Sequence, residues 1–416
     1  MRILIVSNLF PPITTGGYEV ECGAVAEHLG HDHEVLVLTS VPRGEVEPQP
    51  GVRRELTFLS ANAAGSLRAP AATLRAAAAV RRALAFEPDL VYAWNCAAIP
   101  HATVRVLADS GVPVAFRVCE HWFGGLFTHD QFMRELLPAK QARPFGRQAW
   151  AACCRRVNRL QQLRLVPLAP LPAAISWASQ ALEQQVPTPP FVDAVLEQVQ
   201  HPVPRYGELY ARVERAPAAD PEIVFLGRVT HYKGLAVAIE ALAQLRAGAH
   251  AGARLVVIGP EDRDYANRMR ALAAQLGVEQ AVSWRGQLTP ADSADALSRA
   301  HALIVPSVWD EPFGLVAIEA ALARVPVVAS DVGGIGEGLR DEEHALLFEP
   351  GNATAAAAAL ARVLGEPGAS AARVERARAR AEDFGLGPYL EAQEQFVIDA
   401  RAALTRPRVQ PRQAGR

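Results

Sequence analysis

Short runs of consecutive apolar residues alternate with longer amphipathic or alanine-rich stretches over most of the chain. Such runs are typical of parallel β-strands, because helices cover both faces of the sheet and both faces are therefore buried. The runs of the first half are ILIVS (3–7), EVLVLTS (34–40), DLVYAW (89–94) and VPVAFRVC (112–119). The runs of the second half are EIVFLG (222–227), RLVVIG (254–259), VSWRG (282–286), ALIVPS (302–307) and VPVVAS (325–330). Two successive α/β halves predict two doubly wound domains with a cleft between them.

A proline-rich stretch from 186 to 221 interrupts this pattern, and we place the domain boundary within it. We expect an N-terminal Rossmann-like domain over 1–200 and a C-terminal one over 201–384. A long alanine- and arginine-rich helix, broken near FGLGPY, continues into 385–405. Residues 406–416 have no apolar periodicity and are predicted to be a disordered basic tail.

The chain has 416 residues, enough for two domains, and 50% of them are hydrophobic. Its 42 basic and 44 acidic residues leave a formal charge of −2, which argues against a global field that attracts nucleic acid. Five cysteines suit a reducing compartment better than a disulfide framework. The N-terminus turns polar too early for a signal peptide, and no uncharged apolar run approaches the ~20 residues that span a bilayer. We therefore expect a cytoplasmic protein.

The segment 130–165 carries eight basic and two acidic residues, with Trp150 among them. One interpretation is a solvated helix face, as charge-rich stretches usually are. The other is a basic helical insert that contacts an anionic lipid-linked acceptor or the inner face of the membrane, which would make the protein peripheral to that membrane.

The loops that follow the predicted strands are candidate sites, because ligands of open α/β sheets bind beyond the carboxyl ends of the strands. Gly16 and Gly17 follow the first strand and open a helix. They either let the backbone approach a ligand at the helix N-terminus or serve a turn that needs positive φ.

The loop GRVTHYKG (227–234) follows the strand EIVFL and leads into a helix. Arg228 and Lys233 lie five positions apart in this loop. Two cations beside a helix N-terminus favour a pyrophosphate, since charge, hydrogen-bond geometry and helix dipole all attract an anion. Taken singly, either residue would be an ordinary surface charge.

The stretch WDEPFGLVAIEA (309–320) follows the strand ALIVPS. Gly314 and Leu315 are predicted to start a helix, with Glu319 just over one turn inside it and Glu311 in the preceding loop. The two carboxylates could then face one cleft, either as a glycosidase pair ~5 Å apart or as acceptors for sugar hydroxyls. Taken singly, each could be a solvated acid on an amphipathic helix or loop. Beside the two cations, the role of binding hydroxyl groups fits better.

A dinucleotide-dependent dehydrogenase would share this architecture. However, the N-terminal loop lacks the G-x-G-x-x-G spacing, and EVLVLTS ends in Thr39 and Ser40 rather than in an acid for ribose. The glycine-rich GGIGEG (333–338) lies in the wrong part of the chain. The sequence also contains no Walker A motif, no metal-ligand spacing and no G-x-S-x-G elbow.

Together these motifs resemble those of the retaining glycosyltransferases of family 4, the glycosyl transferases group 1, which have the GT-B fold. The similarity covers most of the chain and is strongest over 222–351, in FLGRVTHYKG and PSVWDEPFGLVAIEAALARVPVVASDVGGIGEGLRDEEHALLFEPGN. PPITTGGYE, PDLVYAWN and AISWASQAL of the N-terminal half are weaker matches. The resemblance implies two doubly wound Rossmann-like domains with an inter-domain cleft, and a C-terminal helix over 385–405 that packs on the N-terminal domain.

By this resemblance, Arg228 and Lys233 hold the diphosphate of a sugar nucleotide. Glu319 binds the ribose hydroxyls, Glu311 binds the transferred sugar, and backbone groups near 284–288 recognise the base. No metal or other cofactor is expected, because the cations and a helix dipole stabilise the leaving diphosphate.

Two glycine-containing turns complete the implied nucleotide-sugar site. Phe313, Gly314 and Leu315 contribute backbone donors in the turn after Glu311. From the other domain, Gly16 and Gly17 approach the diphosphate or the acceptor.

The loop after VPVAFRV departs from the family, which commonly carries a His-Asp pair there. Direct alignment places Cys119 and Glu120 at those positions, and His121 follows. His121 takes the catalytic role, with Glu311, if the loop is re-registered; otherwise it is a buried structural histidine.

The implied reaction moves a hexose from a UDP- or GDP-linked sugar to a glycan, lipid-linked or small-molecule acceptor, with retention of the anomeric configuration. The departing diphosphate would itself activate the acceptor hydroxyl. Two alternatives stay open. One is a glycoside hydrolase that uses Glu311 and Glu319 as its acids. The other is a nucleotide-sugar-binding protein without turnover, which the sequence CEHWF would explain.

Overall fold

The computed structural model describes residues 1–14, 16–41, 46–59, 69–124, 152, 155–156 and 170–406. Two compact units make up the chain. Unit 1 comprises Met1–Ala178, Leu182–Gln200 and Leu390–Arg416, and unit 2 comprises Ser179–Ala181 and His201–Tyr389. The predicted basic insert lies outside the described residues except at 152 and 155–156, and the predicted tail lies outside them from 407 onward.

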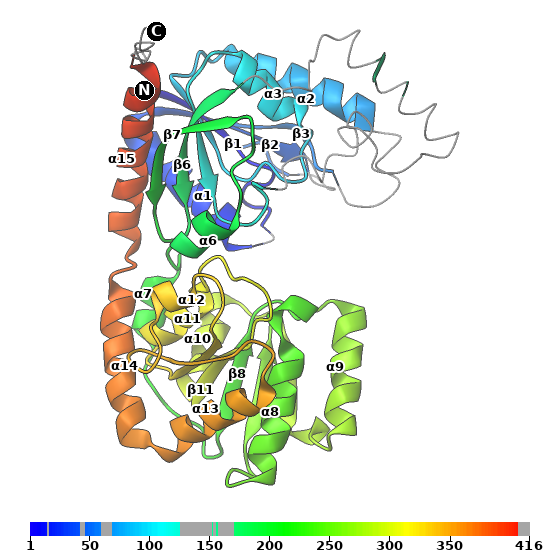
Figure 1. Cartoon of the computed structure of the whole chain (residues 1–416), viewed down its shortest axis with the longest axis vertical. Helices are drawn as coiled ribbons and strands as arrows, with labels where there is room; N and C mark the ends of the chain where they lie inside the picture. The colour runs from blue at the N-terminus through cyan, green and yellow to red at the C-terminus, as the bar shows by residue number, and fades with distance from the viewer. Residues whose placement is uncertain are drawn as a thin grey trace, which may run out of the picture. The chain divides into compact units, whose positions relative to one another are not determined.

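Unit 1 contains a parallel sheet in the strand order β3-β2-β1-β4-β5-β6-β7, with helices packed around it (Figure 1). The described strands are β1 (Arg2–Val6), β2 (Glu34–Val41), β3 (Val52–Thr57), β4 (Leu90–Ala93), β5 (Val114–Val118), β6 (Leu171–Trp177) and β7 (Val192–Val199). The described helices are α1 (Gly17–Asp32), α2 (Ala69–Leu84), α3 (Ala102–Asp109), α6 (Gln180–Gln185) and α15 (Leu386–Thr405), of which α6 and α15 begin within unit 2. In register, Ile5 of β1 pairs with Val37 of β2 and with Tyr92 of β4.

The strands β1, β2, β4 and β5 confirm the apolar runs of the first half as strands. The sequence pattern does not predict β3, β6 or β7. Along VDAVLEQV of β7, exposed and half-buried residues alternate, and this strand lies inside the proline-rich stretch assigned to the boundary. An edge strand with a solvated face lacks the continuous apolar run by which the central strands are found.

A buried polar network surrounds Arg117 of β5, whose side chain is 0% exposed. Its guanidinium donates to Glu21 Oε1 at 2.9 Å, to Ser176 Oγ at 3.0 Å and to the Gln200 carbonyl at 2.8 Å. Gln200 Oε1 accepts in turn from Gln393 Nε2 of α15 at 2.8 Å. The network therefore connects α1 and the sheet of unit 1 with its C-terminal helix.

Replacing Arg117 by methionine is expected to lower the free energy of unfolding by about 3–5 kcal/mol, because Glu21 would remain buried without its cation. Urea denaturation at pH 7 measures this loss. As a matched control, Arg82→Met removes the cation of an exposed pair with Glu55 and should cost less than about 1 kcal/mol. Equal losses in the two variants would contradict the structural role of the network.

Unit 2 contains a second parallel sheet, in the order β10-β9-β8-β11-β12-β13. Its described strands are β8 (Glu222–Leu226), β9 (Arg254–Ile258), β10 (Val282–Gly286), β11 (Ala302–Val305), β12 (Val327–Ser330) and β13 (Leu346–Phe348). Its described helices are α7 (Gly207–Ala211), η2 (His231–Lys233), α8 (Leu235–Ala247), α9 (Arg263–Gln275), η3 (Glu279–Ala281), α10 (Pro290–Arg299), α11 (Leu315–Leu322), α12 (Ile335–Gly338), α13 (Ala353–Gly365) and α14 (Pro367–Glu382). All five predicted strands of the second half are confirmed, and the end of α14 confirms the predicted helix break.

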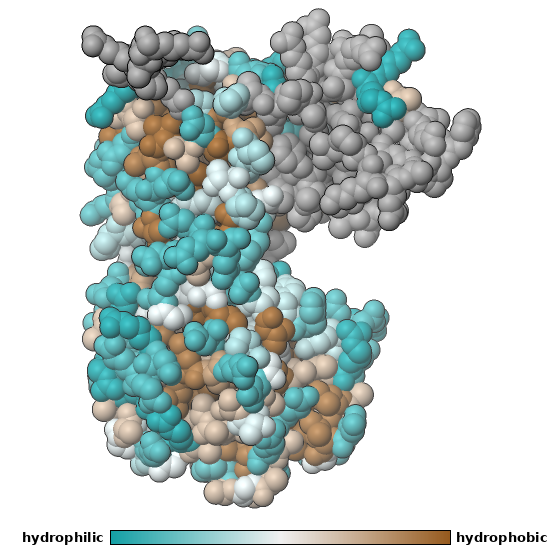
Figure 2. Space-filling view, viewed as in Figure 1, coloured by the Kyte–Doolittle hydropathy of each residue, from teal (hydrophilic) through white to brown (hydrophobic). Residues whose placement is uncertain are grey.

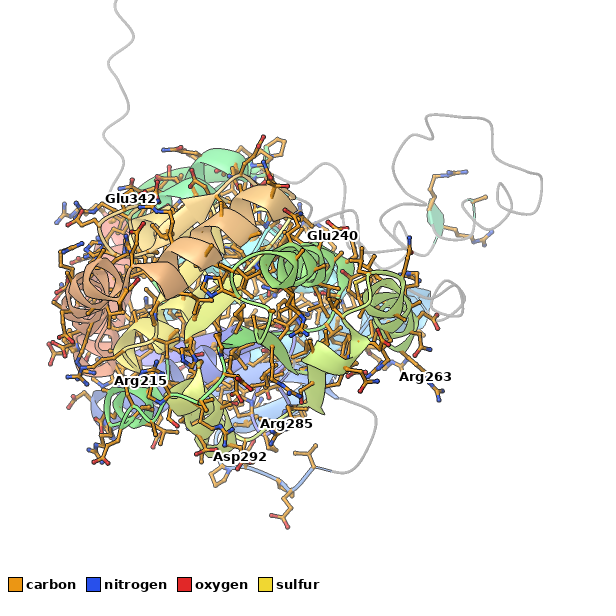
Figure 3. All side chains as sticks on the ribbon, turned by 90° about the horizontal axis from the view of Figure 1, so that it is seen from below. Arg215, Glu240, Arg263, Arg285, Asp292 and Glu342 are labelled. Carbon is orange, nitrogen blue, oxygen red and sulfur yellow. The ribbon has the colours of Figure 1, made fainter. Side chains whose placement is uncertain are left out.

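Polar side chains set the ends of several unit 2 helices. Asp262 accepts from the N–H of Tyr265 at 2.9 Å and starts α9, and Asn352 accepts from the N–H of Ala355 at 2.9 Å and starts α13. Such N-caps satisfy backbone donors that the helix leaves unpaired. Arg215, which is labelled in Figure 3, donates to the carbonyl groups of Leu297 and Ser298 in the last turn of α10.

The face of the molecule drawn in Figure 2 mixes hydrophilic and hydrophobic residues. Large apolar side chains that remain exposed include Tyr206, Leu209 and Val308 of unit 2. Within the described part of the chain, no helix combines the length and the apolar character needed to cross a membrane.

Candidate active site

Unit 2 has a topological switch point between β8 and β11. β9 lies on one side of β8 and β11 on the other, so the connections that leave β8 and β11 turn in opposite directions. Ligands of open α/β sheets bind beyond the carboxyl ends of the strands at such a point. The loops GRVTHYKG and PSVWDEPFG both start there.

Close backbone packing holds these two loops together. Gly234 follows η2 (His231–Lys233) with a left-handed φ of 71°. A Cβ atom at Gly234 would lie 1.7 Å from the carbonyl oxygen of Pro306, so only glycine fits there. The N–H of Val308 also donates to the carbonyl of Tyr232 at 2.9 Å. The residues of η2 are therefore fixed directly against the loop that follows β11.

Lys233 and Glu311 form an ion pair, with 2.6 Å between Nζ and Oε1. Glu311 is only 5% exposed, so its carboxylate is almost entirely removed from water. The same Oε1 accepts a hydrogen bond from the hydroxyl of Ser307. A carboxylate at this depth needs such partners, because an unpaired buried charge is costly. The sequence analysis assigns Lys233 and Glu311 separate roles, whereas the structure places them in contact.

Arg228 is exposed and forms no ion pair with any described residue. Its Cζ lies 5.5 Å from the ring centroid of Tyr232, which packs against the ring of Trp309 at 5.2 Å. Lys233 Nζ lies 5.6 Å from the centroid of that same indole. Two aromatic rings thus link the two cations. The guanidinium of Arg228 keeps its donors available for an anion.

Glu319 lies in α11, just over one turn after the first residue of the helix. It is half-buried, and loss of water around the carboxyl group raises its pKa to about 7. Within the described part of the chain, its carboxyl group makes no hydrogen bond. The pKa of Tyr210 in α7 is raised by burial and also by the charge of Glu319, which places the two side chains near each other. Hydroxyl groups of a ligand could supply the hydrogen bonds that Glu319 lacks.

The turn before α11 combines a core side chain with backbone donors. Gly314 has a left-handed φ of 83° and is the N-cap of α11. The ring of Phe313 is buried, with 4.9 Å to the centroid of His201 and 5.2 Å to that of Phe384. Phe313 therefore contributes its side chain to the core, and the backbone N–H groups around Leu315 are the candidate ligand donors of this turn.

In unit 1, the corresponding switch point lies between β1 and β4. Gly16 is the N-cap of α1 and Gly17 is its first residue. The N–H of Gly16 donates to Glu19 Oε2 at 2.8 Å, and Glu19 is fully buried. A carboxylate beside these donors repels phosphate, so the surroundings of the two glycines favour hydroxyl groups over a diphosphate.

The loop after β5 lies near the start of α1. The hydroxyl of Tyr18 donates to Asn8 Oδ1 at 2.5 Å. Burial, then the charge of Glu19 and then that of Glu120, raise the pKa of Tyr18. His121 is half-buried in the same loop, and its catalytic role stays a prediction.

The predicted base-recognition stretch, 284–288, begins at the end of β10. The ring of Trp284 is covered by Arg270, whose Cζ lies 4.3 Å from a ring centroid. Glu261 accepts from Arg270 at 2.9 and 3.0 Å and so holds it in place. Arg285, labelled in Figure 3, is exposed. A role for the backbone of this stretch stays a prediction.

Ser307 and Tyr210 are site residues that the sequence motifs do not predict. Ser307 directly follows an apolar strand run, a position where ligand-binding side chains often occur, so the sequence holds a signal for it. No spacing relates Tyr210 to Glu319, because only the folded chain brings α7 against α11. Among the described residues, no group of three or more His, Cys, Asp or Glu side chains could hold a metal ion.

Known proteins resemble this chain in sequence and in fold. Residues 208–380 match the family Glycosyl transferases group 1. The glycogen synthase of Mycobacterium tuberculosis is 27% identical over 99% of this chain and 97% of its own. Sucrose-phosphate synthase from Thermosynechococcus elongatus has a similar fold, with a TM-score of 0.70 at 20% identity over 97% of this chain and 99% of its own. Anabaena HepE, solved in complex with UDP-glucose, has a TM-score of 0.66 at 18% identity over 96% of this chain and 100% of its own. The match to glycosyl transferases group 1 thus spans residues 208–380, and the fold of the chain is that of the GT-B glycosyltransferases.

Proposed function

We propose that this glycosyltransferase moves a hexose from a UDP- or GDP-linked sugar to a carbohydrate or lipid-linked acceptor, with retention of the anomeric configuration. The observation that carries the proposal is the set of charges at the switch point of unit 2. Lys233 of the β8 loop contacts Glu311 of the β11 loop, Arg228 belongs to the same β8 loop, and Glu319 lies in α11. A sugar nucleotide needs both kinds of group, cations for its diphosphate and acceptors for its hydroxyls.

The unpaired guanidinium of Arg228 and the N-terminus of α11 supply positive potential without a metal ion. Lys233 uses one of its N–H groups for Glu311 and keeps two for a phosphate oxygen. The proposed site therefore needs no resident metal, because these groups can stabilise the charge that develops on the leaving diphosphate.

In the proposed reaction, the bond between the anomeric carbon and the diphosphate oxygen breaks as the bond from the acceptor oxygen forms on the same face. The departing diphosphate takes the proton of the acceptor hydroxyl. No protein nucleophile is required, and Glu311 and Glu319 act by binding hydroxyl groups. The products are the glycosylated acceptor and a nucleoside diphosphate.

The proposed acceptor would bind near the start of α1, where Glu19 favours hydroxyl groups. The basic insert 130–165, of which the structure describes only residues 152 and 155–156, is the segment that would contact an anionic lipid-linked acceptor or membrane leaflet. Co-sedimentation with anionic vesicles should then fall steeply with added salt.

A panel of UDP- and GDP-sugars, screened by thermal shift and followed by NMR of the anomeric proton in the product, tests the proposal. We expect one sugar nucleotide to raise the melting temperature and to yield a product with the donor's anomeric configuration. Inversion of that configuration would contradict the proposed mechanism. Saturable binding without transfer or donor hydrolysis would favour a binding protein, and release of free sugar from a glycoside without nucleotide would favour a hydrolase.

A further inference from the structure

We propose that Ser307 is a positioning residue for the donor sugar. With Lys233 it occupies one oxygen of Glu311 and so directs the other oxygen to a sugar hydroxyl. This inference rests on the proposed function, in which Glu311 binds the transferred sugar. It assigns a role to a side chain that the sequence analysis does not include.

The two oxygens of the Glu311 carboxylate have different surroundings. Oε1 accepts from both Lys233 Nζ, at 2.6 Å, and the hydroxyl of Ser307. Oε2 is neither hydrogen-bonded to a described residue nor sealed from solvent. A carboxylate can accept about four hydrogen bonds, so Oε2 retains its acceptor capacity for a ligand.

The residues packed around Glu311 restrict its backbone, which favours a fixed orientation of its two carboxylate oxygens. Ser307 lies two residues after the end of β11 and is 1% exposed, and its hydroxyl donates to Glu311. The carbonyl of Glu311 accepts from the N–H of Gly334 at 2.8 Å. A Cβ atom at Gly333 would lie 2.1 Å from that same carbonyl oxygen, so two glycines pack flush against the backbone of Glu311.

Lys233 cannot hold the carboxylate in this orientation alone. Its flexible side chain, 22% exposed, forms a nearly isotropic ammonium contact, and it must also meet the diphosphate of the proposed donor. The hydroxyl of Ser307 donates one directional hydrogen bond from a fixed backbone position. Ser307 therefore maintains the orientation of Glu311 when the ammonium group moves toward phosphate.

The test compares UDP-glucose with UDP by calorimetry on the full chain, or GDP-mannose with GDP if the donor panel selects guanine. In Ser307→Ala, the sugar nucleotide should bind about five- to tenfold more weakly, while the nucleoside diphosphate keeps its affinity within about twofold. The expected split arises because Ser307 acts on the sugar through Glu311 and does not contact the diphosphate. In steady-state assays the KM of the donor should rise more than kcat falls.

Two further variants separate positioning from folding. Ser330→Ala removes another fully buried serine hydroxyl of unit 2, at the end of β12, and should leave both affinities unchanged within about twofold. In a Glu311→Gln background, Ser307→Ala should lower the affinity for the sugar nucleotide by less than about twofold, because the residue through which Ser307 acts is already altered.

An equal loss of affinity for the sugar nucleotide and for the nucleoside diphosphate in Ser307→Ala would overturn the inference. So would an undiminished effect of Ser307→Ala in the Glu311→Gln background. Failure of the wild type to bind any sugar nucleotide would instead contradict the proposed function, so the two failures are distinguishable.

Discussion

Replacing Lys233 by alanine is expected to lower kcat/KM for sugar transfer by about 10²- to 10³-fold, the range for loss of a group that stabilises developing charge. Two effects act together. The diphosphate loses a cation at the switch point, and Glu311, 5% exposed, loses its ion-pair partner and keeps only the neutral hydroxyl of Ser307. Without the lysine, the negative charge of Glu311 would also repel the diphosphate.

Steady-state kinetics with the donor selected by the panel measure this loss, and thermal denaturation shows whether the variant is folded. Arg362→Ala is the matched control, since it removes a cation from a more exposed ion pair of unit 2, with Glu342 at 2.7 Å. The control should keep kcat/KM within about twofold of the wild type. A folded Lys233→Ala protein with kcat/KM within tenfold of the wild type would remove Lys233 from the proposed site.

Glu319→Gln is expected to lower the affinity for the sugar nucleotide by about 10- to 100-fold, because a charged acceptor for ribose hydroxyls becomes a neutral amide. The same change should stabilise the protein without ligand. Burial raises the pKa of Glu319 from 4.5 to about 7, so the folded state holds a proton that the unfolded state has released between these pH values. The contribution of Glu319 to stability is therefore present below pH 4.5 and is lost as the pH rises through 7.

Urea denaturation of both proteins at pH 5 and pH 8 checks the second effect. We expect the free energy of unfolding of Glu319→Gln to exceed that of the wild type by about 1–3 kcal/mol at pH 8 and by clearly less at pH 5. A variant that binds donor weakly yet unfolds at higher urea would show that Glu319 serves binding at the expense of stability. A stability difference that does not change with pH, or unaltered donor binding, would contradict this role.

The central strands of both sheets are predictable from the sequence because they are buried on both faces. β8 and β11 read as continuous apolar runs for that reason. β7 is not predictable in this way, because its residues alternate in burial and follow Pro189 and Pro190. β13 has only three residues, too few to show any period.

The candidate site is predictable as a set of residue types but not as a set of contacts. Arg228, Lys233 and Glu311 stand out because they lie in loops between a strand and a helix, and Glu319 because it lies in the first turns of the helix that follows. The contact of Lys233 with Glu311 depends on the backbone of Gly234 lying against the residues after β11, which no spacing in the sequence reports. The sequence likewise does not predict that the Glu19 carboxylate turns back to the N–H of Gly16. The direction of that side chain cannot be inferred from the glycines of the turn.

A crystal structure of the full chain with the selected sugar nucleotide tests the central claim most directly. We expect the diphosphate within hydrogen-bond distance of Arg228 and Lys233, with the ribose hydroxyls on Glu319 and a sugar hydroxyl on Glu311. A nucleotide bound at the start of α1 in unit 1, with the loops after β8 and β11 free of ligand, would contradict it.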